Sequence, residues 1–341
     1  MTDTNKQWLL KNRPSGMVAP DDFEMVETPM PSPDFDRGQV LVKNLVLGFD
    51  PAMRGWIEDV RSYLPPVAIG EPMRASGVGQ VVASENTALP VGTLVQGLLN
   101  WQEYSVGDPA GLVPPHPLPE GVPPNMALSV FGTTTLTAYY GLLDVGQPTK
   151  GETVLVSGAA GATGSVVAQI AKLKGCRVIG IAGGKEKCQW LLDECGLDGV
   201  IDYKNEDIDA RLGELCPDDI NVFFDNVGGD TLETAISHMA DFGRIVLCGA
   251  ISQYNNEQPA PGPNNLMILV SRRIRMQGFI VLDYLDRADE AFAEVGAWVM
   301  DGKIAWREDL QEGFNNIPAT LQRLFDGRNQ GKQLLKLADP S

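Results

Sequence analysis

Histidine is scarce in this chain, and cysteine is confined to its second half. The 341 residues include two histidines, His116 and His238, and five cysteines, none of them in a CxxC pair. A four-cysteine zinc lobe is therefore excluded, and the odd cysteine count argues against a disulfide framework. A catalytic zinc site is not expected either, because the only histidine of the first half lies between prolines in VPPHPLP. We expect no metal, and a structural role for His238 within a helix.

Long apolar runs and an excess of basic residues are also missing. No apolar run approaches the about 18 residues that span a bilayer, and the start MTDTNKQWLLKNRP lacks the order of a signal peptide. The formal charge of −17, from 44 acidic and 27 basic residues, repels nucleic acid and anionic membranes. These features predict a cytoplasmic protein that acts on a small molecule, and an anionic ligand would need a locally basic pocket.

The apolar fraction of 43% is sufficient for packed cores, and the pattern changes along the chain. Residues 1–125 contain short apolar runs broken by Pro and Gly, which favour a mostly β domain. From Thr153 onward, apolar strand-like runs alternate with helical patterns, which indicates a parallel sheet covered on both faces. The last stretch is expected to rejoin the first domain. The prediction is a doubly wound dinucleotide-binding domain (126–300) inserted into a β-rich catalytic domain (1–125 plus 301–341), with the active site between them.

A strand, a glycine-rich turn and a helix follow one another in TVLVSGAAGATGSVVAQIAKLKG. At GxGxxG spacing the three positions are Ala159, Gly161 and Gly164, so the first glycine is an alanine. Gly161 would let the backbone approach a pyrophosphate, and a helix beginning at Ser165 would supply unpaired N–H groups. The pattern favours dinucleotide binding over the alternative, an ordinary tight turn in an unrelated α/β protein.

The acid that grips a ribose hydroxyl in NAD enzymes is missing. About 20 residues past Gly164 the sequence reads AGGKEK, with Gly183 and Gly184 followed by Lys185 and Lys187. Small residues leave room for a ribose 2′-phosphate, and an ammonium group can pair with it. NADP(H) is therefore favoured over NAD(H). The alternative is that both lysines lie on a solvated helix start, although positive charge there is slightly unfavourable.

The order of several motifs resembles the zinc-independent medium-chain dehydrogenase/reductases over nearly the whole chain. These motifs are AAGATGSVVAQIAKLKGC, AGGKEK, FFDNVGG, GRIVLCGAISQYN and NQGK. Within that family the chain is most similar to the leukotriene/prostaglandin reductase branch, which includes curcumin and alkenal double-bond reductases. The resemblance implies a Rossmann domain inserted into a GroES-like catalytic domain. The tripeptide at Arg74, Ala75 and Ser76 matches the zinc-free branch, where zinc-dependent relatives carry Gly-His-Glu.

The same resemblance implies the cofactor-binding residues. The diphosphate would be held by the turn from Gly161 to Gly164, and the 2′-phosphate by Lys187 rather than Lys185, together with Tyr203. The other residues implied to contact NADP(H) are Ala162, Thr163, Asn226, Cys248, Gly249, Ala250, Ile251, Ser252, Tyr254, Phe279, Val281 and Asn329. The sequence departs from the branch at Thr133, Thr134 and Thr135, where relatives commonly have Met-Pro-Gly.

The implied reaction is hydride transfer from NADPH to the β-carbon of an α,β-unsaturated ketone or aldehyde. Negative charge then develops on the carbonyl oxygen, so the transition state needs a hydrogen-bond donor. Tyr254 is the candidate, because a phenol donates while it stays neutral at pH 7; the alternative is a tyrosine that only contacts the cofactor. A quinone reductase and a non-catalytic NADPH-binding protein remain open as other functions.

Two further expectations concern the surroundings of the site. Met53, Arg54, Tyr63 and Trp101 are candidate walls of the substrate pocket, although the aromatic residues are equally compatible with the core. Arg54 would either meet a substrate carboxylate or tie a loop by an ion pair. The run RIRMQGFIV, residues 273–281, is expected to form an edge strand that pairs across a homodimer, as in relatives.

Overall fold

The computed structural model describes residues 4–340, and the chain divides into two compact units. Unit 1 comprises Met1–Ser129 and Glu308–Ser341, and unit 2 comprises Val130–Arg307. Unit 1 is thus built from both ends of the chain, with unit 2 as a continuous insertion. Across residues 4–340, no helix has the length and apolar character that crossing a membrane requires.

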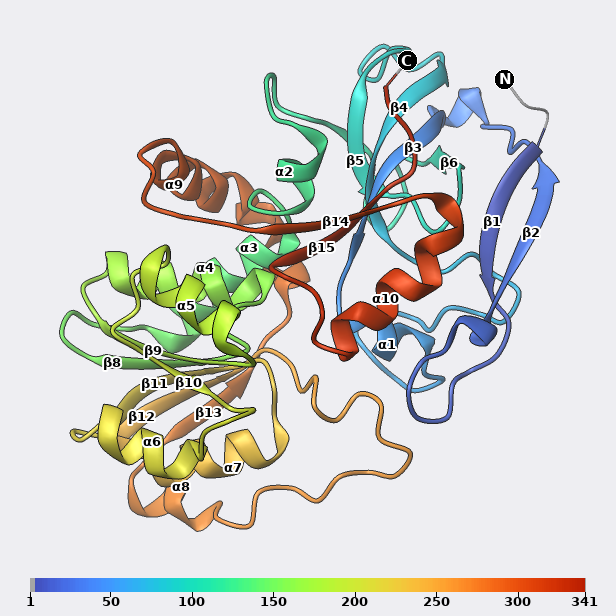
Figure 1. Ribbon diagram of the computed structural model, residues 1–341. Coiled ribbons are helices and arrows are strands. Elements are labelled where there is room, and N and C mark those ends of the chain that lie inside the picture. The colour runs from blue at the N-terminus through green and yellow to red at the C-terminus, as the bar shows by residue number, and fades with distance from the viewer. Residues whose placement is uncertain (1–3, 341) are drawn as a thin grey trace. The chain divides into compact units, whose positions relative to one another are not determined.

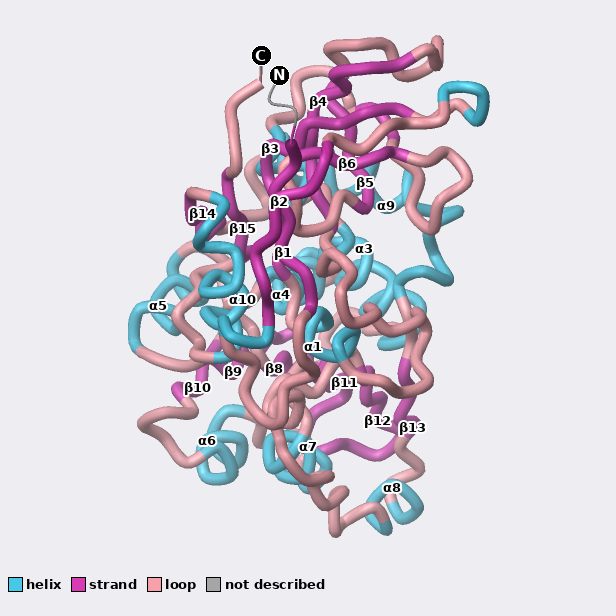
Figure 2. The backbone as a smooth tube through the Cα atoms, turned by 90° about the vertical axis from the view of Figure 1, so that its right-hand side faces the viewer, coloured by secondary structure: helices cyan, strands magenta, loops and turns pink. Residues whose placement is uncertain are grey.

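Unit 1 consists mainly of strands and connecting loops, as Figure 2 shows. A separate antiparallel ribbon joins β1 (Thr4–Leu10) to β2 (Phe23–Pro29). The main sheet has the order β14 (Glu308–Glu312), β15 (Lys332–Lys336), β3 (Val40–Phe49), β4 (Ser76–Ser84), β5 (Leu94–Leu98) and β7 (His116–Pro117), with β6 (Tyr104–Gly107) also paired to β3. The α-helices are α1 (Ala52–Ile57), α2 (Pro124–Leu128) and α10 (Ile317–Phe325), and the 3-10 turns are Pro20–Asp22, Phe35–Arg37 and Phe314–Asn316.

The core of unit 1 forms around β3 and Trp101. Nearly every residue of β3 is buried, which matches its continuous apolar run. The Trp101 ring is fully buried, with its centroid 4.8 Å from that of Phe23 and 5.8 Å from that of Phe49. Met53 belongs to the same cluster. Of the candidate pocket walls, Met53 and Trp101 are therefore core residues.

Unit 2 is a doubly wound parallel sheet, which confirms the predicted fold class. Its six strands are β10 (Gly199–Asp202), β9 (Arg177–Ala182), β8 (Thr153–Ser157), β11 (Ile220–Asp225), β12 (Met239–Leu247) and β13 (Arg275–Gly278), in that order. Figure 1 shows α4 and α5 on one face of the sheet and α6 and α7 on the other. All five residues of β8 are buried, because both faces of this strand are covered. The strand β13 lies at one edge of the sheet.

The helices of unit 2 agree with the predicted alternation, apart from two local differences. The helices are α3 (Thr133–Tyr140), which continues into a π-helical turn (Gly141–Gly146), α4 (Ala162–Leu173), α5 (Lys185–Asp193), α6 (Ile208–Leu215), α7 (Gly229–Ser237), α8 (Met267–Ser271) and α9 (Ala288–Met300), with a 3-10 segment at Val281–Arg287. The expected start of α4 at Ser165 is wrong, because the Ser165 N–H already donates a helical hydrogen bond to the Gly161 carbonyl at 3.0 Å. His238 lies just past the end of α7 rather than inside it, with its Nε2 2.7 Å from an Asp209 carboxylate oxygen.

Candidate functional site

The turn between β8 and α4 brings helix and strand into direct contact. Gly158 has φ +58°, a backbone conformation that L side chains rarely adopt. A Cβ at Gly164 would lie 2.4 Å from the Gly158 carbonyl oxygen, so only glycine allows this approach. The N-cap of α4 is Gly161, which has no side chain to accept from the first amides of the helix. The amides of Ala162, Thr163 and Gly164 therefore form the kind of helix N-terminus that binds phosphate.

A buried carboxylate fixes the neighbouring strand end. Asp225, at the end of β11, is fully buried and accepts a hydrogen bond from the Ser157 hydroxyl at 2.7 Å. Its side chain also accepts from the amides of Val227 at 3.0 Å and Gly228 at 3.0 and 3.1 Å. Asn226 donates to the Ser157 carbonyl at 2.7 Å. The predicted Asn226 is thus held beside the glycine turn by two adjacent strand ends.

Asp225 also anchors the loop that follows β12. Burial raises the pKa of this carboxyl, although the Ser157 and backbone hydrogen bonds act in the opposite direction. Its backbone oxygen accepts from the amides of Cys248 at 2.9 Å and Gly249 at 3.2 Å. The carboxyl ends of β8, β11 and β12 are therefore joined at the edge where doubly wound sheets bind their ligands.

The turn between β9 and α5 contains the two glycines that replace the expected acid. A Cβ at Gly183 would lie 2.7 Å from Cε1 of the Tyr203 ring. Tyr203 itself is 51% exposed, so its ring lies on the backbone of this turn with one side open. Gly184 has φ +94° and is the N-cap of α5, and nothing lies within 4 Å of a Cβ placed there. The turn is therefore open beside Tyr203.

An acid is nevertheless present at this turn, and it comes from the next strand. Asp202, the last residue of β10, accepts from the Gly184 amide at 2.7 Å. The same carboxylate accepts from the Lys204 amide at 3.2 Å and the Asn205 amide group at 2.8 Å. The Gly184 hydrogen bond is the main reason that the pKa of Asp202 lies below its usual value. With three donors already bound, Asp202 positions the turn and is not disposed to grip a ribose. Sequence reasoning missed this residue.

The two lysines of the turn occupy the first turn of α5. Lys185 is its first residue and Lys187 its third. A positive side chain at a helix N-terminus is unfavourable unless an anion binds there. The contact between Tyr203 and Gly183 brings the predicted Tyr203 to the turn that carries Lys187, whereas the sequence separates these residues by a whole helix and strand.

The loop from Cys248 to Tyr254 folds over the Asn226 turn. The Ile251 amide donates to the Asn226 carbonyl at 3.2 Å, and the Ser252 hydroxyl donates to the Val227 carbonyl at 2.6 Å. The Tyr254 hydroxyl accepts from the Ala250 amide at 3.1 Å, so the phenol closes its own loop. This hydrogen bond fixes the position of the phenol at the end of the loop.

An aromatic cluster surrounds the predicted Phe279. A Cβ at Gly141 would lie 2.4 Å from Cζ of the Phe279 ring, which packs directly on the π-helical turn after α3. The rings of Phe224 and Tyr284 each lie 6.4 Å from Phe279 in edge-on geometry. Val281 begins the 3-10 segment that follows. The departure at Thr133 to Thr135 forms the first turn of α3, with Gly132 as its N-cap.

The remaining predicted residues lie in unit 1. The Asn329 side chain donates to the Gly331 carbonyl at 3.0 Å, which shapes the NQGK turn before β15. Arg54 is buried and donates to the carbonyls of Pro14 at 3.3 Å and Gly16 at 3.2 Å, and it forms an ion pair with Glu58. Arg54 therefore ties a loop, and the alternative of a substrate carboxylate contact is wrong.

The five thiols are free and shielded. Cys176, Cys188, Cys195 and Cys216 are buried, and Cys248 is partly buried. Burial raises the pKa of Cys188 and Cys216 to about 11 and of Cys195 and Cys248 to about 12, and it also raises that of Cys176. The residues from 4 to 340 contain no group of three or more His, Cys, Asp or Glu side chains that could hold a metal ion.

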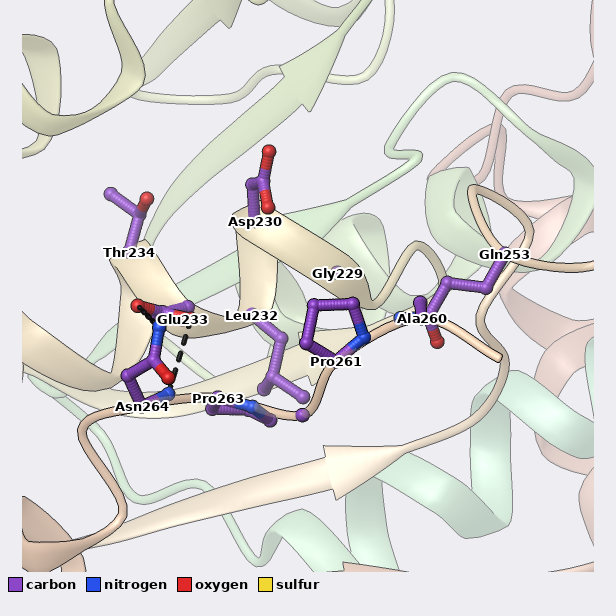
Figure 3. Close-up of a pocket in the computed structure, with 11 residues that line it drawn as sticks. Gly229, Asp230, Leu232, Glu233, Thr234, Gln253, Ala260, Pro261, Pro263 and Asn264 are labelled. Carbon is purple, nitrogen blue, oxygen red and sulfur yellow. Dashed lines mark hydrogen bonds between the residues drawn. The ribbon is translucent and has the colours of Figure 1, made fainter. Parts of the chain in front are cut away.

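A pocket of about 390 Å³, with both polar and apolar lining, lies beside the start of α7. Figure 3 shows the segment that carries Ala260, Pro261 and Pro263 running along this helix, with Asn264 turned toward Glu233. Asn264 donates to the two Glu233 carboxylate oxygens at 3.2 and 3.3 Å, through its backbone and side-chain nitrogens. Asp230 and Glu233 make this pocket unsuitable for a phosphate.

Comparison with known proteins identifies the family of this chain. Residues 6–114 match the profile of a family described as "N-terminal domain of oxidoreductase", and residues 162–299 match "Zinc-binding dehydrogenase". An NADPH-dependent curcumin reductase of Escherichia coli (strain K12) is 39% identical, across 98% of this chain and 97% of the relative. Prostaglandin reductase 1 of Rattus norvegicus is 40% identical, across 97% and 98%.

The chain belongs to the NADP-dependent branch of the medium-chain dehydrogenase/reductases. A crystal structure of CurA in complex with NADPH from Vibrio vulnificus superimposes on it with a TM-score of 0.91 at 40% identity, covering 98% of this chain and 100% of CurA. The family resemblance inferred from the motifs is therefore confirmed, and so is the prediction of an NADP-dependent oxidoreductase.

Proposed function

We propose that this protein reduces the carbon–carbon double bond of α,β-unsaturated ketones and aldehydes with NADPH. The observation that carries the proposal is full-length similarity of about 40% to the curcumin and prostaglandin reductases and to the NADPH complex of CurA. The local geometry supports it, because the glycine turn and the Tyr203 turn stand at the carboxyl edge of one sheet.

The residues of unit 2 suit the cofactor. The diphosphate would lie at Gly161, Ala162, Thr163 and Gly164, where glycines keep the first amides of α4 uncovered. The 2′-phosphate would lie at the open turn of Gly183, with Lys187 and Tyr203 as its partners. Asn226, Phe279, Val281 and the loop Cys248–Tyr254 would surround the nicotinamide, and Asn329 is proposed as a further cofactor contact. We assign unit 1 as the catalytic domain and unit 2 as the NADP-binding domain.

Tyr254 is proposed to assist the reaction. When bound, NADPH supplies the hydride that adds to the β-carbon. Negative charge then grows on the substrate carbonyl oxygen, and the Tyr254 hydroxyl would donate a hydrogen bond to it. Because the Ala250 amide already donates to the Tyr254 oxygen, the phenol is held in a fixed position at the end of its loop. A positioned donor does not need to reorganise as the charge appears.

Three further features are part of the proposal. The enzyme would be zinc-independent, because Arg74, Ala75 and Ser76 replace the zinc-branch tripeptide. It would form a homodimer through β13, an edge strand whose unpaired backbone groups can extend a sheet. It would work in the cytoplasm, without a nucleic-acid or membrane partner.

A spectrophotometric panel tests the function. Oxidation of NADPH, followed at about 340 nm, is expected with enones and enals, and NADH should be a much poorer donor. Turnover of 1,4-quinones without enones would instead support a quinone reductase. Tight NADPH binding without turnover of any acceptor would indicate a cofactor-binding protein that has lost catalysis.

A further inference from the structure

The Asp225 carboxylate is the centre of a hydrogen-bond network inside unit 2. It is fully buried, and it accepts from the Ser157 hydroxyl at 2.7 Å and from the amides of Val227 at 3.0 Å and Gly228 at 3.0 and 3.1 Å. The Ser157 oxygen in turn accepts from the Asn226 amide at 2.8 Å. A buried carboxylate is unfavourable unless hydrogen bonds answer its charge, so these donors are held firmly in place.

One peptide group connects this carboxylate to the loop that follows β12. The N–H of the peptide between Val227 and Gly228 donates to Asp225, and its carbonyl accepts from the Ser252 amide at 3.2 Å and the Ser252 hydroxyl at 2.6 Å. A Cβ at Gly228 would lie 2.9 Å from the Ala250 Cβ, so the bare backbone packs directly on the loop. A displacement of this peptide therefore displaces the loop.

The same loop sets the position of the Tyr254 hydroxyl. The Ala250 amide donates to the phenol oxygen at 3.1 Å, and a Cβ at Gly249 would lie 2.9 Å from that oxygen. The Gly249 amide donates to the backbone oxygen of Asp225 at 3.2 Å. Both residues that contact the phenol oxygen are thus attached to Asp225 or to the peptide that its carboxylate holds.

We infer that Asp225 is a positioning residue for Tyr254. The carboxylate fixes the Val227–Gly228 peptide, the peptide fixes the loop, and the loop fixes the phenol oxygen. The inference rests on the proposed function, because it takes Tyr254 as the donor to the substrate oxygen. Such a donor acts through its position, and a misplacement of about 1 Å can lower a rate by about 100-fold.

Asp225→Asn tests the inference, because it keeps the size of the side chain and replaces one acceptor oxygen by an NH2 donor. We expect kcat for a neutral enone to fall by about 10-fold to 100-fold. The Kd for NADPH, measured by fluorescence, should stay within about threefold. The reason for this difference is that the first amides of α4 and the turn at Gly184 are positioned by contacts that do not involve Asp225.

A double-mutant cycle shows whether the effect passes through Tyr254. In a Tyr254→Phe background, Asp225→Asn should lower kcat by less than about twofold, because the donor that it positions is already absent. An equal loss of kcat in both backgrounds would overturn the inference, and so would an unchanged kcat in the single variant Asp225→Asn.

Asp198→Asn is the matched control. Asp198 also accepts from a backbone amide of the sheet, that of Val178 at 2.7 Å, but it does so near the beginning of β9. It should leave kcat unchanged, and a loss equal to that of Asp225→Asn would overturn the inference. Thermal unfolding shows which variants fold. If Asp225→Asn does not fold, Ser157→Ala removes one donor to the same carboxylate and replaces it in the cycle, with the same outcomes deciding.

Hydrogen–deuterium exchange separates this inference from the proposed function. Without NADPH, the amides of residues 248–254 should exchange at least about fivefold faster in Asp225→Asn than in the wild type, whereas those of β9 should not change. If the loop exchanges faster but the wild type reduces no enone, the proposed function fails and the positioning contact stands. If enones are reduced while the exchange of the loop is unchanged, the inference alone fails.

Discussion

The Tyr203 ring occupies the space that a side chain at Gly183 would need. Its Cε1 lies 2.7 Å, and its hydroxyl 2.9 Å, from the position of a Cβ at residue 183. The glycine after β9 and the tyrosine after β10 are therefore mutually dependent. Because nicotinamide cofactors are distinguished near this turn, the pair would determine whether the proposed 2′-phosphate site has room.

Gly183→Ala should displace the Tyr203 ring. We expect KM for NADPH to rise about tenfold, which corresponds to about 1.4 kcal/mol of binding free energy, with KM for NADH nearly unchanged. Steady-state kinetics with both cofactors measure the difference. An equal rise for NADH would show a general distortion of the domain and contradict a specific 2′-phosphate seat.

The two lysines of α5 should differ in effect. Lys187→Ala should raise KM for NADPH by about tenfold with little change for NADH, because it removes the proposed charged partner of the 2′-phosphate. Lys185→Ala serves as the matched control, since it removes the same charge from the same helical turn and should do much less. Equal effects of the two substitutions would mean that the lysines act only through their charge, without a specific contact between Lys187 and the 2′-phosphate.

Gly164 and Gly213 form a pair for a stability measurement. Gly164→Ala would place a methyl group 2.4 Å from the Gly158 oxygen, and we expect it to lower the free energy of unfolding by about 1–3 kcal/mol. Gly213 lies in α6 with nothing within 4 Å of its Cβ position, so Gly213→Ala should raise the free energy of unfolding by about 0.5–1 kcal/mol. Urea unfolding measures both, and a stable Gly164→Ala protein would refute the close helix–strand contact.

Tyr254→Phe tests the proposed donor. Loss of one oxyanion donor typically lowers kcat by about 100-fold or more, so we expect a fall of that size on a neutral enone. The substitution also removes the acceptor of the Ala250 amide, so the Kd for NADPH should be measured by fluorescence in parallel. An unchanged kcat would mean that Tyr254 only closes its loop.

Asp202 should show its positioning role in two substitutions. Asp202→Ala frees the Gly184 amide and should raise KM for NADPH, whereas Asp202→Asn keeps an acceptor and should largely restore it. The Gly184 hydrogen bond lowers the pKa of Asp202, so its stabilising contribution is present above the ordinary value of about 3.9 and is lost as pH falls through the lower folded pKa. Acid unfolding of Asp202→Asn should lack this component below about pH 4. Identical acid unfolding curves for Asp202→Asn and the wild type would contradict this contribution of Asp202 to stability.

The sequence was sufficient for the sheet of unit 2, because its strands are continuous apolar runs and the glycine turn follows directly in the chain. The start of α4 was expected too late in the chain. Gly164 lies inside the helix, where the lack of a side chain lets the helix contact the end of the strand. Asp202 was missed because the search for an acid followed the chain from Gly164. The carboxyl ends of neighbouring parallel strands meet at one edge of the sheet. Asp202, the last residue of the predicted strand GVID, could therefore have been proposed from the sequence.

The surroundings of the substrate were less predictable. The sequence left two roles open for Arg54, a contact with a substrate carboxylate or an ion pair that ties a loop. The choice between them depends on folding, which brings the Pro14 and Gly16 carbonyls to Arg54. Trp101 was equally ambiguous, because core and pocket aromatic residues follow the same local pattern.

The shielding of the five thiols has a chemical consequence for an enzyme of this kind. Unsaturated ketones and aldehydes alkylate thiolates, so a reductase of these compounds is exposed to self-inactivation by its own substrates. The nucleophile in that reaction is the thiolate, and the raised pKa values leave almost none of it at neutral pH. Four of the side chains are also buried. The fold thus gives the catalyst resistance to the electrophiles that it consumes.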